Sequence, residues 1–145
     1  PRVAICFPSA RDYGSTEKRL AESRAAASIL GAGPVEQWDG GDLVERMREI
    51  DSRVKPTRVF APSENASHPE HVAVARAAAT VFGDRVTRFH TYAADGVKIR
   101  DGELVPFAPE WAAMKRRALA CYRTQLAHPR AKRFFADDLA EYIDP

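Results

Sequence analysis

At 145 residues, with 45% apolar and 29% charged residues, the chain has the length and composition of a single globular domain spanning residues 1–145. A net charge of +2, with no motif that combines basic and aromatic residues, argues against nucleic acid as a partner. The chain contains no signal-peptide pattern and no apolar run of about 18 residues, and its two cysteines are far apart, so we expect a cytoplasmic protein without a membrane span.

Extended apolar segments and helical patterns alternate along the first 92 residues. The strand-like segments lie at 3–7, 35–38, 58–61 and 85–92. The helical patterns, with apolar residues spaced three and four apart, lie at 16–30, 42–54 and 69–82. Because this alternation is typical of parallel βαβ units, we expect an α/β fold with three Rossmann-like layers and a mostly parallel sheet.

The pattern changes after residue 92. Asp101-Gly102 is a dipeptide favoured in two-residue turns, and the extended runs on either side of it predict a C-terminal hairpin. A long helix is expected at 109–126, where Pro109 suits the first helical position. The segment 133–143 predicts a last short helix.

The segment NASHPEH, residues 65–71, follows the third strand and contains two histidines three residues apart. Pro69 suits the first position of a helix, so we expect His68 to cap that helix and His71 to lie in its first turn. Residues three apart share one face of a helix, and ligands of parallel sheets gather where strands end and helices begin. Since zinc accepts neutral imidazole, the pair indicates either a metal and acid–base site or only the polar start of a helix.

Three segments together carry a resemblance to a known family. RVFAPSENASHPEHVAVARAA resembles the second metal-binding segment of the PIG-L/LmbE-like zinc-dependent N-deacetylases, which carry a His-Pro-Asp-His motif after a central strand. RLAESRAAASILGAGPVEQWDGGDL resembles the family's Arg-x-x-Glu helix, which is followed by a short strand and an aspartate. MKRRALACYRTQ resembles its late helix, which ends in a His-Ser-Gln-like triplet. The three segments occur in the family's order and cover most of the chain.

The resemblance implies a role for each residue of the histidine motif. His71 would be a zinc ligand, and His68 would be the catalytic residue that stabilises the oxyanion and protonates the leaving amine. Glu70 stands where the family has aspartate, and it would orient one of the histidines if its longer side chain is tolerated. The implied cofactor is Zn2+.

Three residues outside this motif also match the family. Arg19 corresponds to an arginine that holds the substrate, with Glu22 beside it in a supporting position, and Asp39 corresponds to an acid that contacts the sugar. Each has a structural alternative. Arg19 and Glu22 could form a surface ion pair on their helix, and Asp39 in the sequence WDGGD could be a turn former or a helix cap.

One part of the family pattern has no counterpart in the sequence. The family's Ala-His-Pro-Asp-Asp loop supplies a histidine and an aspartate to zinc and a second aspartate as the general base. The loop after the first strand here, FPSARDYGST, contains Asp12 and no histidine. We therefore expect the family's first strand, first helix and metal loop to be missing. A zinc ion held by His71 alone would lack the ligands that catalysis requires.

Three explanations of this departure stay open. The chain is a fragment of a longer protein, a natural short member that has lost catalysis, or a chain that obtains its missing ligands elsewhere. The resemblance implies a zinc-dependent hydrolase that removes an N-acyl group, typically acetyl, from a small-molecule amino-sugar conjugate. The alternative is a non-catalytic module of the same fold that binds a sugar or a partner. The oligomeric state is also open, and a homo-oligomer is one option.

Overall fold

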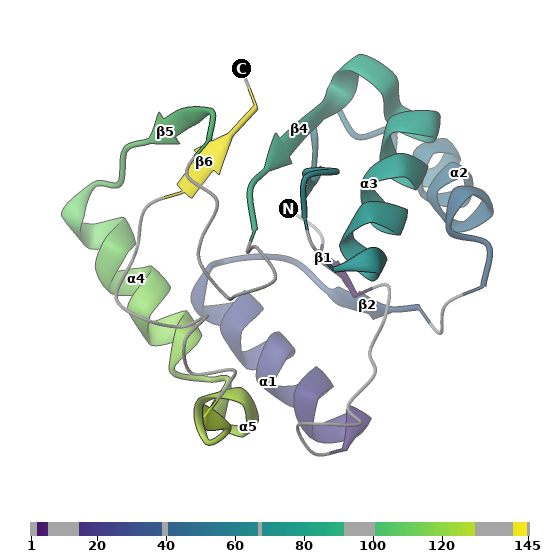
Figure 1. Ribbon diagram of the computed structural model, residues 1–145. Coiled ribbons are helices and arrows are strands. Elements are labelled where there is room, and N and C mark those ends of the chain that lie inside the picture. The colour runs from purple at the N-terminus through teal and green to yellow at the C-terminus, as the bar shows by residue number, and fades with distance from the viewer. Residues whose placement is uncertain are drawn as a thin grey trace. The chain divides into compact units, whose positions relative to one another are not determined.

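A computed structural model describes residues 3–5, 15–38, 41–66, 68–91, 101–129 and 141–144 (Figure 1). The contacts within the chain divide it into two compact units. The first unit consists of Pro1–Asp39 and Phe107–Leu139, and the second consists of Gly40–Pro106 and Ala140–Pro145. The expectation of a single domain stays a prediction.

The first unit contains a parallel strand pair and its crossover helix. Strand β1 (Val3–Ile5) pairs in parallel with β2 (Val35–Gln37), and α1 (Thr16–Ile29) connects them. A parallel pair needs such a crossover, because a tight turn cannot join two strands that run in the same direction. Ser15 caps α1, since its side chain accepts a hydrogen bond from the backbone N–H of Lys18 at 3.3 Å.

The helix predicted at 109–126 is interrupted. It forms α4 (Pro109–Leu119) and the short α5 (Arg123–Leu126), and both contact α1. The carboxylate of Glu22 on α1 accepts a hydrogen bond from the backbone N–H of Thr124 at 2.9 Å. A negative group at the N-terminus of a helix satisfies a free N–H and interacts favourably with the helix dipole, which stabilises a new helix start here.

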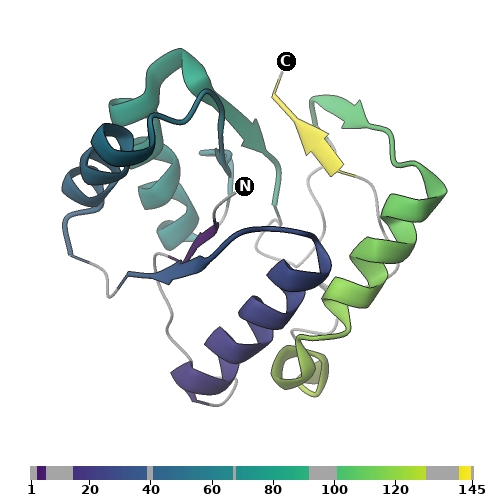
Figure 2. The same cartoon turned by 180° about the vertical axis from the view of Figure 1, so that it is seen from behind.

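The second unit is built around a mixed sheet with the strand order β3-β4-β6-β5. Strands β3 (Val59–Pro62) and β4 (Val86–Phe89) are parallel, and α3 (Pro69–Phe82) and a 3-10 turn, η1 (Gly83–Arg85), connect them. Helix α2 (Leu43–Val54) precedes β3 and packs beside α3, as Figures 1 and 2 show. These elements confirm the α/β class, with parallel strands joined by helices.

The end of the chain differs from the sequence expectation. Residues Glu141–Ile143 form strand β6, which pairs antiparallel with β4 and with β5 (Glu103–Val105), so the helix predicted over them is wrong. Backbone pairing outweighs the local helical pattern, because β6 fills the position between two strand edges. The first half of the predicted hairpin lies outside the described residues, and its second half, β5, pairs with β6.

His90 anchors this end of the sheet. Its backbone N–H donates to the carbonyl of Tyr142 at 2.9 Å, and its Nε2 lies 2.9 Å from Oδ1 of Asp144. The imidazole is buried, with 2% of the side chain exposed. His90 therefore has a structural role between β4 and β6.

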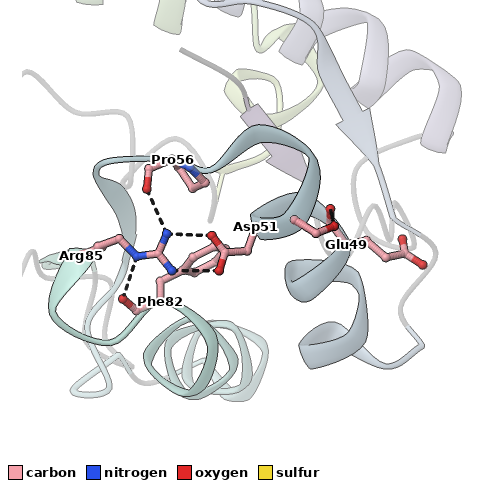
Figure 3. Close-up of polar contacts among 6 residues, drawn as sticks. Glu49, Asp51, Pro56, Phe82 and Arg85 are labelled. Carbon is pink, nitrogen blue, oxygen red and sulfur yellow. Dashed lines mark hydrogen bonds and ion pairs between the residues drawn. The ribbon is translucent and has the colours of Figure 1, made fainter.

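An ion pair joins α2 to the start of β4. Arg85 donates from Nη1 to Oδ1 of Asp51 at 2.7 Å and from Nη2 to Oδ2 at 2.9 Å, and it also donates to the carbonyls of Pro56 and Phe82 (Figure 3). The hydrogen bonds that Arg85 donates to Asp51 lower the pKa of the Asp51 carboxyl, although partial burial opposes the shift. The pair thus ties the end of α2 to the turn that follows α3.

We expect Asp51→Asn to lower the stability of the protein in a pH-dependent way. Because the pKa of Asp51 is lower in the folded state than in the unfolded state, its contribution is present at neutral pH and is lost as the pH falls below about 4. Chemical denaturation of the wild type and the variant measures this difference. The control is Glu49→Gln, which removes an exposed acid from the same helix. If the difference in the free energy of unfolding between wild type and Asp51→Asn does not change with pH, the pKa of Asp51 is not lowered by folding.

No helix among the described residues combines the length and the apolar character that crossing a membrane requires.

Candidate functional site

The two histidines of the sequence motif lie at the start of α3, the helix that follows β3. Strands β3 and β4 are parallel neighbours, so their carboxyl ends lie at the same edge of the sheet. Ser63, directly after β3, is buried and donates its backbone N–H to the carbonyl of Phe89 at 2.9 Å. This bond joins the segment that follows β3 to the last residue of β4. Such an edge is the usual position of ligand sites in parallel sheets.

His68 is the N-cap of α3, as predicted. Its backbone is extended, with φ −86° and ψ 123°, and Pro69 occupies the first turn. The Nδ1 atom of the ring accepts a hydrogen bond from the backbone N–H of Glu70 at 3.3 Å. Proline has no N–H to satisfy, so the imidazole can cap the next free donor of the helix. The cap fixes Nδ1 of His68 and leaves Nε2 on the other side of the ring.

The imidazoles of His68 and His71 face each other across one turn of α3. Their ring centroids are 5.4 Å apart and their planes are tilted by 43°. His68 is exposed, whereas His71 is half-buried. Burial lowers the pKa of His71, the neighbouring His68 lowers it further, and Glu70 opposes the shift. The pair therefore consists of one solvent-facing ring and one sheltered ring that is neutral at pH 7.

Glu70 lies beside His68. Its Oε2 is 3.7 Å from Nδ1 of His68, which is beyond hydrogen-bond distance, and 41% of its side chain is exposed. The carboxylate can interact with His68 when the imidazole is protonated. Glu70 also raises the pKa of His71, so its orienting role toward either histidine stays a prediction.

Sequence reasoning missed Thr91, which contacts His71 at this site. Its Oγ1 lies 3.4 Å from Nδ1 of His71, and its side chain is buried, at 8% exposed. Thr91 follows the end of β4, the parallel neighbour of β3. The sequence pattern placed Thr91 inside a strand predicted over 85–92, whereas β4 ends at Phe89, so no local signal identified it.

Arg19 and Glu22 belong to the first unit, where they contact the start of α5. Oε2 of Glu22 accepts a hydrogen bond from Oγ1 of Thr124 at 2.6 Å. When the Gln125 amide is oriented to satisfy both of its polar atoms, its nitrogen donates to Glu22 at 3.1 Å and its oxygen accepts from Nη2 of Arg19 at 3.1 Å. Gln125 is buried, at 7% exposed. Glu22 therefore holds α5 in place, and Gln125 fixes the guanidinium of Arg19.

Several solved structures share this fold, including two that are similar to this chain over most of its length. A deacetylase triple mutant, Orf2*T, that is involved in the teicoplanin biosynthetic pathway has a TM-score of 0.66 at 17% identity, covering 92% of this chain and 75% of its own. The conserved protein TT1542 from Thermus thermophilus has a TM-score of 0.64 at 19% identity, covering 99% of this chain and 80% of its own. No protein-family model matches the sequence, and no curated protein is significantly similar to it. At these identities the likeness shows the fold alone.

The described residues do not form a complete zinc site. A catalytic zinc ion needs about three protein ligands. Among the residues that the structure describes, no group of three or more histidine, cysteine, aspartate or glutamate side chains could hold a metal ion. Besides His68 and His71, the described residues at this edge of the sheet include His90, whose Nε2 lies 2.9 Å from Oδ1 of Asp144. Asp39, the predicted sugar contact, and Asp12 lie outside the described residues.

Proposed function

We propose that this chain is a hydrolase that removes an N-acyl group, acetyl in the simplest case, from a small molecule containing an amino sugar. The observation that supports this proposal is the imidazole pair at the carboxyl end of β3, with ring centroids 5.4 Å apart and one exposed ring. The fold shared with a deacetylase is consistent with it. Membership of the PIG-L/LmbE-like family is part of the proposal.

Hydrolysis of an amide needs a group that stabilises the oxyanion and a group that protonates the leaving amine. His68 is exposed, so its Nε2 is accessible to a substrate, and its cap bond restrains the ring. We assign both tasks to this atom: Nε2–H donates to the oxyanion, and the ring in its protonated form, with the carboxylate of Glu70 beside Nδ1, then gives the proton on Nε2 to the amine and returns to neutral imidazole. His71 is neutral at pH 7, because burial and His68 lower its pKa, and it therefore offers a lone pair.

Zinc is proposed as the cofactor on the strength of the sequence resemblance. His71 would be its ligand in this chain, and the further ligands would come from outside the described residues. None of the steps assigned to His68 depends on the metal. Arg19 and Asp39 are proposed to bind the substrate, and Gln125 already orients the guanidinium of Arg19.

A second candidate is a non-catalytic module that binds a sugar or a partner. The observation that favours it is that the described residues contain no group of three ligands for a metal ion. The same edge of the sheet and the same imidazoles would then bind a ligand without cleaving it.

Free acetate released from N-acetylglucosamine and its conjugates tests the two candidates against each other. The assay is run on the protein with added zinc and with a chelator, and the bound metal is quantified in parallel. The hydrolase proposal predicts one acetate for each free amine formed, and about one zinc ion per chain. Saturable binding of the sugar with no acetate released, and no zinc bound, would establish the module instead.

A further inference from the structure

The two histidines of the site have different hydrogen-bond partners at the same ring atom. Nδ1 of His68 faces the backbone N–H of Glu70 at 3.3 Å, and Nδ1 of His71 faces the hydroxyl of Thr91 at 3.4 Å. A neutral imidazole carries one proton, on either Nδ1 or Nε2. The hydrogen-bond partner of Nδ1 therefore determines whether Nε2 donates or accepts a hydrogen bond. Both Nε2 atoms lie on the ring edge opposite these partners.

The tautomer of His68 follows from its role as a helix cap. A backbone N–H can only donate, so Nδ1 of His68 must be the acceptor and carry no proton in the neutral ring. The proton is then on Nε2. The exposed edge of His68 is therefore a hydrogen-bond donor.

The contact of His71 with Thr91 allows the opposite arrangement. A hydroxyl can donate or accept, so the 3.4 Å distance between Oγ1 of Thr91 and Nδ1 of His71 admits a ring N–H that donates to the hydroxyl. The proposed function selects this arrangement, because it needs a lone pair at Nε2 of His71. If Nδ1–H of His71 donates to Thr91, Nε2 of His71 keeps its lone pair. Thr91 is buried and lies two residues after the end of β4, which places its hydroxyl beside the ring of His71.

We propose that Thr91 is a positioning residue that holds His71 in the tautomer opposite to that of His68, so that the site presents one Nε2–H donor and one Nε2 lone pair. This inference rests on the proposed function, in which His68 donates to an oxyanion and His71 offers a lone pair to a proton or a metal ion. It adds a residue that selects which nitrogen of His71 is available.

The tautomers can be read directly from the imidazole 15N shifts of the labelled full chain, at a pH above the titration range of histidine and without metal. His68→Gln and His71→Gln assign the signals. The expected result is Nε2–H for His68 and Nδ1–H for His71. Thr91→Val, which keeps the shape and removes the hydroxyl, should shift His71 toward the Nε2–H form, and Thr91→Ser should restore the wild-type signal.

An Nε2–H signal for His71 in the wild type would overturn the proposal, whether or not the valine variant folds. A His71 spectrum unchanged by Thr91→Val would overturn it as well. Acetate release measured on the same samples tests the proposed hydrolase function separately from the role of Thr91. Opposite tautomers without acetate release would leave the role of Thr91 standing and reject the hydrolase.

Discussion

Replacement of His68 by asparagine should lower the turnover number for acetate release by about 100-fold, with little change in stability. Asparagine is among the best helix N-caps, so it can replace the bond that Nδ1 of His68 makes to the N–H of Glu70. It cannot donate a proton to a leaving amine. The measurement is steady-state hydrolysis of an N-acetyl amino-sugar conjugate, together with the midpoint of thermal unfolding.

The alanine variant separates the two roles of His68. His68→Ala should lose the same turnover and should also destabilise α3 by about 1 kcal/mol, because the cap is lost. If the asparagine variant keeps wild-type turnover, His68 is a helix cap and not a catalytic residue. The two variants thus distinguish a catalytic His68 from a His68 that only caps α3.

Gly102→Ala should destabilise the protein by about 3 kcal/mol, the largest stability effect that we expect from one small substitution. Gly102 has a φ of +95°, a conformation that L-residues rarely adopt. A methyl group at this position would also meet the carbonyl oxygen of Ile143 more closely than Cβ atoms approach backbone, and it would lie 3.1 Å from Nε2 of His90. The turn before β5 can therefore pack against β6 only without a side chain.

Gly41→Ala is the matched control for this prediction. Gly41 also has a positive φ, +75°, but a Cβ atom there would meet nothing within 4 Å. Its replacement should cost about 1 kcal/mol, from the backbone conformation alone. Equal free energies of unfolding for the two variants, measured by chemical denaturation, would show that the approach of Ile143 to Gly102 does not matter.

Local patterns in the sequence predicted the helices up to α3 closely, whereas β4 ends at Phe89, three residues before the predicted end of its strand at 92. The apolar spacing placed α1, α2 and α3 within about a residue of their observed bounds, and Pro69 identified His68 as a cap. These features depend on residues that are near one another in the chain. The spacing of three residues likewise predicted that both histidines share one face of the helix.

Features that depend on distant residues could not be predicted in this way. The break between α4 and α5 depends on the carboxylate of Glu22, which lies 102 residues before Thr124. Strand β6 forms because β4 and β5 pair with it, although the pattern over 133–143 as a whole indicated a helix. Thr91 reaches His71 only because β3 and β4 are neighbours in the sheet.

The proposed function requires that an N-acetyl amino sugar binds at His68 and His71. Titration of the labelled protein with N-acetylglucosamine, followed through the imidazole signals of its histidines, measures whether it does. The signals of His68 and His71 should shift together and saturate, because the two rings are 5.4 Å apart. Saturable binding of the sugar with both of these signals unchanged would contradict this requirement.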